Sequence, residues 1–363
     1  MGLNISKIAR LYSILAHNLL TIVILVFVLN IMAFAVIKIK GTFFPVYTLT
    51  ELQKTVYPGM STSDISVLLE ETWNRPWQYE PWVGFKEKPR SGKFVNISNE
   101  GFRLSHIKKQ HLDSTGINIY VFGGSTTFGY GVDDLSTIPA YLQKHLSKQY
   151  PEKNINVFNF GRGYYYSSQE LALLLSLIEN NHIPAIAIFV DGLNEGQTEP
   201  HYTKELSRMF DAYNYEQYKL FMGVVENSSL MCVVKKMMSY VIDLPSEEEN
   251  LSPMDTYKNY LKNKELINDI AEKYNFQTYF FIQPIPGYRN NFLHHMFLQK
   301  DRPAEWDQRM ALLEKTVNNE NSFSLTNLLE NYGHQPFVDD VHYTAEVCDL
   351  IATNMAQDIK IPQ

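Results

Sequence analysis

Hydrophobic residues are spread unevenly along this chain, and the longest continuous run lies near its N-terminus. Residues 11–37 contain no Asp, Glu, Lys or Arg, and from Leu19 to Ile37 the only polar interruptions are Thr21 and Asn30. A helix needs about 20 apolar residues, at a rise of 1.5 Å each, to cross the hydrocarbon core of a bilayer. The pattern therefore predicts an N-terminal membrane anchor over residues 1–40.

Two alternatives to this anchor remain open. A buried core helix is disfavoured because the run is apolar on every face and stands at the start of the chain. A cleaved signal peptide is the stronger alternative, since Ala33–Ala35 resembles an A-x-A cleavage site and Lys7 and Arg10 form a basic leader. However, the apolar core of a typical signal peptide has about 7 to 15 residues, and this run is longer and continues past the possible cleavage site. Basic residues on both sides leave the orientation undecided.

The remainder changes character near residue 116. Residues 41–115 are rich in Pro and Gly and predict an irregular lead-in. Beyond it, short apolar runs alternate with helix-length segments, which predicts a parallel sheet covered by helices on both faces, a three-layer α/β/α sandwich. The predicted strands are 117–122, 155–160, 185–190 and 278–282, and the predicted helices are 137–150, 171–178, one ending at 267–274, and 344–358.

Two details refine this outline. Ser167 and Glu170 have the spacing of a capping box ahead of the helix at 171–178. Residues 196–262, rich in Tyr, Met and charge, interrupt the alternation and predict an inserted helical lid or side wall. The expected organisation is an anchor over 1–40, a lead-in over 41–115 and an α/β domain over 116–363 that carries the insertion.

Composition excludes several classes of protein. The 363 residues are 45% hydrophobic and 20% charged, as in ordinary globular proteins, so a disordered or collagen-like chain is excluded. The net charge of -7 gives no basic surface for nucleic acid, which we do not expect as a partner. Cys232 and Cys348 lack metal-binding or redox spacing, and His294 and His295 lack partners at ligand spacing. We therefore expect neither a metal nor a cofactor.

A small-residue loop follows the first strand of the predicted sheet. Residues 123–129 read GGSTTFG, which leaves the hydroxyl of Ser125 exposed at a sharp turn, as a nucleophile requires. A phosphate-binding loop is disfavoured because no Lys follows the glycines, and the GxSxG elbow fails because position 127 is Thr. Taken alone, the loop suits an ordinary tight turn better than a catalytic one.

Three further motifs stand at strand or helix junctions. Residues 159–163 (NFGRG) and 191–195 (DGLNE) each end a predicted strand, and a glycine N–H or the Asn194 amide could bind an oxyanion. Just before the last helix, His342 could act as a base for Ser125, with Asp339 three residues upstream orienting its ring. Each motif also has a plain alternative, because Gly and Asn form turns and Thr344 could simply cap a helix beside a surface histidine.

Taken in order, the four motifs resemble the SGNH (GDSL-like) hydrolases, in which four blocks contribute Ser, Gly, Asn and His to one site. The resemblance covers about residues 116–358, and residues 95–103 (VNISNEGFR) are similar to a segment found ahead of the first block. It implies Ser125 as nucleophile and first oxyanion donor through its own N–H, with Gly163 and Asn194 as the other donors. It also implies His342 as base and Asp339 as the orienting acid.

Two departures from the family pattern stand out. Gly124 occupies the position where the first block usually has Asp, which leaves the nucleophile in place. In the second block three tyrosines, Tyr164–Tyr166, follow Gly163, so Gly161 is an alternative donor.

The resemblance also implies an activity, that of a serine esterase, which together with the predicted anchor gives a membrane-anchored enzyme. Such an enzyme would hydrolyse O-acyl esters, with acetyl expected, on a glycan or lipid of the cell envelope or on a small molecule, in a domain held outside the cytoplasm. The alternatives are an O-acyltransferase that uses the same acyl-serine, and a non-catalytic envelope scaffold. Four aromatic residues of the lead-in suit either sugar stacking or packing against the main domain: Trp73, Trp77, Tyr79 and Trp82.

Overall fold

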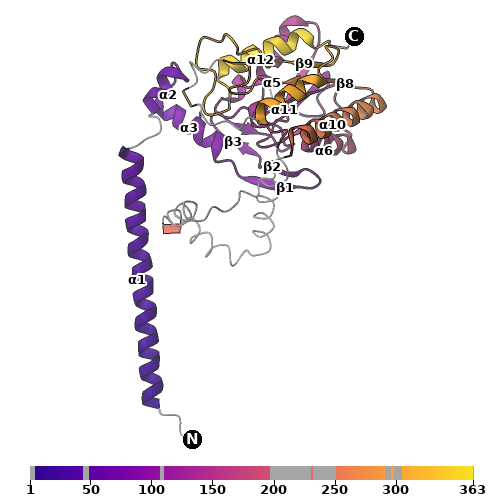
Figure 1. Ribbon diagram of the computed structural model, residues 1–363. Helices are drawn as coiled ribbons and strands as arrows, with labels where there is room; N and C mark the ends of the chain where they lie inside the picture. Colours follow the sequence, from indigo (N-terminus) through magenta and orange to yellow (C-terminus); the bar gives the residue numbers. More distant parts are fainter. Residues whose placement is uncertain are drawn as a thin grey trace. The chain divides into compact units, whose positions relative to one another are not determined.

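The computed structural model describes most of the chain. The described residues are 5–43, 49–106, 110–196, 230–231, 251–290, 296–297 and 305–362. The chain divides into two compact units, Met1–Thr48 with Phe210–Glu247, and Leu49–Met209 with Glu248–Gln363. Each unit is described separately below, and Figure 1 gives the element labels.

The first unit contains one long helix, α1 (Ile5–Phe43). Its segment Tyr12–Ala35 is long and apolar enough to cross a membrane. At 1.5 Å per residue these 24 residues extend about 36 Å. The large apolar side chains of this segment are exposed all round the helix, as expected for a segment whose surroundings are apolar. Such a helix suits either a membrane anchor or a signal sequence.

The second unit is built on a five-stranded parallel sheet. In chain order its strands are β5 (Ile117–Gly123), β6 (Ile155–Asn159), β7 (Ile186–Asp191), β8 (Gln277–Ile282) and β9 (Ser322–Ser324). In space the order is β6-β5-β7-β8-β9, with every pair parallel. The first four strands confirm the predicted sheet. The fifth was not predicted, because a three-residue Ser-Phe-Ser strand has no hydrophobic run to mark it.

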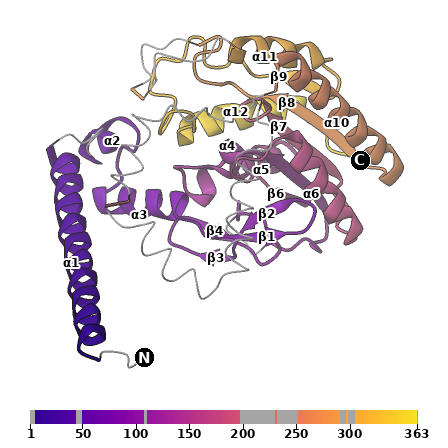
Figure 2. The ribbon, with the colours of Figure 1, turned by 60° about the horizontal axis from the view of Figure 1, so that its bottom comes forward.

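Helices cover both faces of this sheet (Figure 2). On one face α5 (Ile138–Gln149) and α12 (Ala345–Asp358) pack against one hydrophobic cluster. On the other face α6 (Ser167–Glu179) and α10 (Pro253–Tyr274) pack against a second cluster. The three-layer α/β/α fold is therefore confirmed.

The alternation of side chains along the strands divides the core by chemistry. Ile119 and Val121 of β5 face α5 and α12, among mainly aliphatic neighbours. On the opposite face Phe122, Phe189 and Phe280 stack across three strands, with ring centroids 5.0 and 5.1 Å apart. Because β7 is buried along its whole length, its sequence is an apolar run without polar alternation up to its last residue, Asp191.

The lead-in is more ordered than its Pro and Gly content predicts. It contains α2 (Leu49–Thr55), α3 (Thr62–Trp73) and two antiparallel pairs, β1 (Trp77–Glu80) with β2 (Gly84–Glu87) and β3 (Arg90–Ser91) with β4 (Asn96–Ile97). The N-cap of α3 is Ser61, whose hydroxyl accepts the N–H of Asp64 at 3.1 Å. Val83 and Phe85 enter the aromatic core. The prediction of an irregular segment was wrong because these short elements depend on that packing.

The predicted capping box at Ser167 is also wrong. Helix α6 begins at Ser167 itself, after Tyr166, and its N-cap makes no side-chain hydrogen bond. The hydroxyl of Ser167 instead donates to Glu195 at 2.7 Å, and Glu170 is buried. By contrast, Thr137 and Thr344 cap α5 and α12 through their side chains.

The remaining short elements complete the second unit. They are α4 (Ser125–Phe128), η1 (Asp134–Ser136), α11 (Glu305–Leu313) and η3 (Glu314–Thr316). Most of the predicted insertion over 196–262 lies outside the described residues, as do Cys232, His294 and His295. Helix α10 begins within that predicted range, at Pro253. Cys348 lies buried in the aliphatic core.

Candidate active site

The serine loop follows β5 directly, and Ser125 is the first residue of the single-turn helix α4. Glycines precede it for steric reasons. A Cβ at Gly123, where φ is +154°, would lie 2.2 Å from Oγ1 of Thr127, and one at Gly124 would lie 2.5 Å from Nδ2 of Asn194. The departure at position 124 therefore has a local cause, because a larger residue would displace the Asn194 amide.

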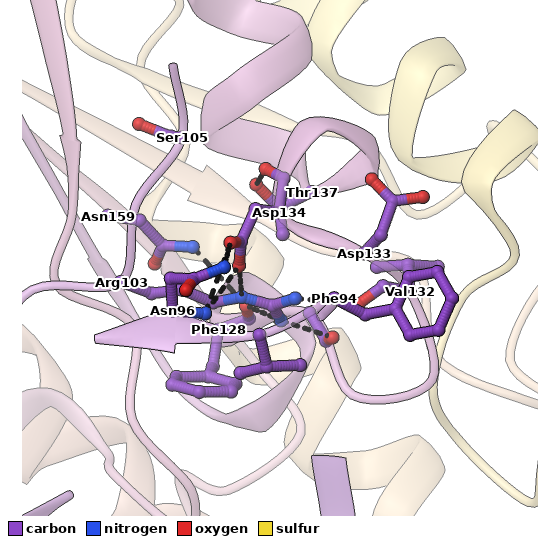
Figure 3. Close-up of polar contacts among 12 residues, drawn as sticks. Phe94, Asn96, Arg103, Ser105, Phe128, Val132, Asp133, Asp134, Thr137 and Asn159 are labelled. Carbon is purple, nitrogen blue, oxygen red and sulfur yellow. Dashed lines mark hydrogen bonds and ion pairs between the residues drawn. The ribbon is translucent and has the colours of Figure 1, made fainter. Parts of the chain in front are cut away.

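Arg103 holds the far end of this loop (Figure 3). Its side chain is fully buried, and it donates to the carbonyls of Phe128, Gly129 and Val132 at 2.9, 2.7 and 2.7 Å. Nε donates to Asp134 at 2.8 Å, which neutralises the buried charge. The segment 95–103 thus fixes the turn that follows Ser125.

Gln283 links the serine loop, by hydrogen bonds, to the segment that carries His342. Its Oε1 accepts a hydrogen bond from the hydroxyl of Thr126 at 2.7 Å and another from the hydroxyl of Tyr343 at 3.0 Å. Gln283 directly follows β8, so the central sheet joins the neighbours of Ser125 and His342.

His342 lies in the turn before α12 and is buried, not on the surface. Its Nε2 lies 2.7 Å from Oγ of Ser125, a residue 217 positions away in sequence. Its Nδ1 lies 2.8 and 2.9 Å from the two carboxylate oxygens of Asp339. A carboxylate only accepts hydrogen bonds, so Nδ1 carries a proton, and when Nε2 carries none it accepts the hydroxyl hydrogen of Ser125.

The carboxylate of Asp339 is kept ionised by its surroundings. Burial alone would raise its pKa, but the hydrogen bond and charge of His342 lower it, and so do the backbone N–H groups of Val341 and His342. The net result is a pKa below the ordinary value for Asp. These N–H groups donate to Oδ1 at 3.0 and 2.9 Å. The turn thus holds Asp339 and His342 together.

Two aromatic rings enclose the imidazole. Tyr130 stacks on it with the ring centroids 4.7 Å apart, and Trp73 meets it edge-on at 5.3 Å. The hydroxyl of Tyr130 accepts a short hydrogen bond from Arg75, which pairs with Glu87 at 3.4 Å. Sequence reasoning missed Tyr130 and Arg75, because nothing near them in the chain marks a contact with His342.

The lead-in aromatics divide into two groups. Trp73 contacts His342, and Trp77 stacks on Phe85 with a centroid distance of 4.8 Å. Trp82 is 84% exposed and Tyr79 is 51% exposed. Packing thus accounts for Trp77, whereas Trp73 belongs to the site.

The structure separates the two candidate glycine donors. The N–H of Gly161 donates to Oδ1 of Asn159 at 3.0 Å, so its hydrogen is already used. The N–H of Gly163 makes only a long contact, 3.5 Å, with Oε1 of Glu87. A Cβ would lie 2.3 Å from the backbone N of Phe128 at Gly161 and 2.3 Å from the hydroxyl of Tyr130 at Gly163, so both positions require glycine and only the hydrogen bonds separate them. Gly163 is the better candidate.

Asn194 also lies beside the serine loop. Its Nδ2 donates to the carbonyl of Tyr165 at 2.8 Å and stands against Gly124. An amide nitrogen has two hydrogens, so one remains for a ligand. Within the described parts of the chain, no group of three or more His, Cys, Asp or Glu side chains is arranged to hold a metal ion.

Solved structures with a similar chain path include several hydrolases. An alpha/beta hydrolase from the metagenome of Lake Arreo aligns at 15% identity and a TM-score of 0.41, over 68% of this chain and 96% of its own. An acetyl xylan esterase aligns at 11% and 0.41, over 67% and 100%. A lipolytic protein of the G-D-S-L family from Veillonella parvula aligns at 12% and 0.39, over 66% and 97%.

No family model and no curated protein matches the sequence. The sequence identities and TM-scores to the solved structures are too low to bear on activity.

Proposed function

We propose that this protein is a serine esterase that hydrolyses O-acyl esters. The observation that carries the proposal is the continuous contact from Ser125 Oγ through the His342 ring to Asp339, with distances of 2.7 and 2.8 Å. Nucleophile, base and orienting acid are the three parts that acyl transfer through serine requires. Ser125 is only partly buried, so an ester can reach it.

In the first half-reaction the Ser125 oxygen attacks the ester carbonyl while Nε2 of His342 takes its proton. Asp339 stabilises the resulting imidazolium, and His342 then returns the proton to the departing alcohol. The ring of Tyr130 stacks flat on the imidazole and helps to hold it beside Ser125. In the second half-reaction, water attacks the acyl-serine with His342 again as base.

We assign the oxyanion donors to the N–H groups of Ser125 and Gly163 and to Nδ2 of Asn194. One such donor contributes about 3 kcal/mol to lowering the barrier. The geometry supports Gly163 over Gly161, because the Gly161 hydrogen is committed to Asn159.

The substrate class and location form a second layer of the proposal. We propose that α1 anchors the protein in a membrane, that the α/β domain over 116–363 lies outside the cytoplasm, and that the ester is an acetyl group on an envelope glycan or lipid. The exposed apolar surface of Tyr12–Ala35 supports the anchor. The half-exposed Trp73 beside His342 offers a face for a sugar ring or an acyl chain.

Substitution of the nucleophile tests the activity. We expect Ser125→Ala to lose at least about 10³-fold in kcat on p-nitrophenyl acetate and to lose labelling by a fluorophosphonate. The matched control is Ser91→Ala, an exposed serine of β3, which keeps both. Full esterase activity in Ser125→Ala would refute the proposal. With a labelled acetyl ester, free acetate indicates hydrolysis, whereas label on an added sugar indicates transfer.

A further inference from the structure

A buried carboxylate connects two of the segments that supply the proposed oxyanion donors. Glu195 follows Asn194 and is 5% exposed. Its Oε1 accepts the N–H of Ser167 at 2.8 Å, and its Oε2 accepts the hydroxyl of the same residue at 2.7 Å. Both carboxylate oxygens of Glu195 therefore accept hydrogen bonds from Ser167. Ser167 lies four positions after Gly163.

The neighbouring Asn194 bridges the same two segments, through its hydrogen bond to the carbonyl of Tyr165. Asn194 and Glu195 thus make three hydrogen bonds to residues 165–167, where the turn after Gly163 meets α6. That turn includes Tyr164 at φ +66°, a left-handed conformation that a bulky residue rarely adopts. Such a backbone is retained only where the surroundings fix it.

The hydrogen bonds around Ser167 have a defined direction. Nδ2 of Asn263, from α10, donates to Oγ of Ser167 at 2.9 Å. The serine hydroxyl therefore accepts from Asn263 and donates to Glu195. This arrangement uses Glu195 as an acceptor on both oxygens, which is the hydrogen-bonding pattern of a carboxylate and not of an amide.

The raised pKa of Glu195 indicates that its charge is unfavourable in this place, so the stability of the fold alone does not explain why a carboxyl group stands here. Burial and the nearby charge of Asp191 raise its pKa to about 8, although the two contacts with Ser167 lower it. A buried carboxyl group costs free energy that a neutral residue of similar shape would avoid. What the carboxylate adds is a rigid connection between the two donor segments.

We propose that Glu195 is a positioning residue for the oxyanion hole: by holding Ser167 through both oxygens, it sets the N–H of Gly163 and the amide of Asn194 at the spacing that one oxyanion requires. This proposal rests on the proposed function, because it presupposes that these groups stabilise an oxyanion. Glu195 itself touches neither substrate nor nucleophile. It acts through the turn at 163–167.

The test replaces Glu195 by Gln, which keeps the shape but gives one side a donor in place of an acceptor. At about pH 9, above the pKa of about 8 and therefore with Glu195 ionised, we expect Glu195→Gln to lower kcat about 10- to 100-fold on p-nitrophenyl acetate, with KM changed less than about twofold, because the lost interaction acts in the transition state. Fluorophosphonate labelling of Ser125 should slow by a similar factor. Ser167→Ala keeps the backbone contact and should lose about three- to tenfold.

Glu170→Gln is the matched control. Glu170 belongs to the same buried acidic cluster, and burial together with the charges of Asp191 and Glu195 raises its pKa well above the ordinary value. These shifts favour the neutral carboxyl group, whose shape and charge Gln reproduces. We expect kcat within about twofold of the parent chain, together with an unchanged Tm or a small change.

The outcomes separate the two proposals. If the parent chain labels at Ser125 and hydrolyses the ester, but Glu195→Gln and Ser167→Ala keep the parental kcat, the positioning role is wrong and the esterase stands. If both variants lose kcat and Tm in the same proportion as Glu170→Gln does, the role is merely structural and the inference is refuted. A parent chain that neither labels nor hydrolyses any ester removes the basis of both proposals.

Discussion

Asp339 and Glu195 are both carboxylates beside the candidate site, and their pKa values are shifted in opposite directions. Burial opposes ionisation at each of them. At Asp339 the His342 ring and two backbone N–H groups outweigh burial and lower the pKa, whereas at Glu195 burial and Asp191 prevail and raise it to about 8. The difference lies in the neighbours: a ring that becomes cationic faces Asp339, while another carboxylate faces Glu195.

This contrast separates two uses of one chemical group. Asp339 would supply negative charge to an imidazolium that forms during the reaction. Glu195 would supply two acceptor atoms at fixed positions, and its charge is a cost. Variants of the two carboxylates test this distinction, because each changes one property and leaves the other in place.

The largest effect is expected from Asp339→Asn, which keeps the shape of the side chain and removes its charge. The amide can donate to Nδ1 and so select the wrong tautomer of His342. We expect kcat to fall by about 10⁴-fold, as when a triad carboxylate is replaced by its amide. The measurement is kcat on p-nitrophenyl acetate near pH 7. The control is Asp340→Asn, at the next position, which should stay within about twofold.

Sequence reasoning went far with this half of the site, and the reason is local. Asp339 and His342 stand three residues apart in one turn, and Ser125 stands at the end of an apolar run, so short motifs marked all three. The four longer strands were predictable for a similar reason, because burial on both faces makes each of them rich in apolar residues.

The supporting residues depend on contacts between distant segments. Arg75 and Tyr130 stand 55 residues apart, and Ser167 and Glu195 stand 28 apart. The spacing of Ser167 and Glu170 even predicted a capping box, because the motif is defined by local geometry. The hydroxyl of Ser167 instead donates to the buried carboxylate of Glu195. No local pattern could reveal this outcome.

A smaller effect is expected from Trp73→Ala, which removes the ring edge that meets His342 at 5.3 Å. An aromatic contact of this kind contributes about 1 kcal/mol, so kcat/KM on p-nitrophenyl acetate should fall about 5- to 10-fold. Trp82→Ala is the control, because Trp82 is 84% exposed. Equal losses in both variants would mean that Trp73 does not act through His342.

The smallest effect is expected in the pH dependence of stability, to which Asp339 and Glu195 contribute with opposite signs. Asp339 has a lowered pKa, so its contribution is present above its unfolded pKa and is lost as the pH falls. Asp191 and Glu195, with pKa values raised to about 6 and about 8 by burial first of all, bind protons that the unfolded chain has released. Their contribution is complete below the unfolded pKa of a carboxyl group and is lost as the pH rises to about 8.

Urea unfolding at a series of pH values measures this slope. Between pH 6 and 8 the parent chain should lose free energy of unfolding on the order of 1 kcal/mol, and Glu195→Gln should lose less, because the amide does not titrate. Asp339→Asn should keep the parental slope in this range, since the pKa of Asp339 lies below it. If Glu195→Gln keeps the parental slope instead, Glu195 is already ionised at pH 6, and the contrast between the two carboxylates is one of geometry alone.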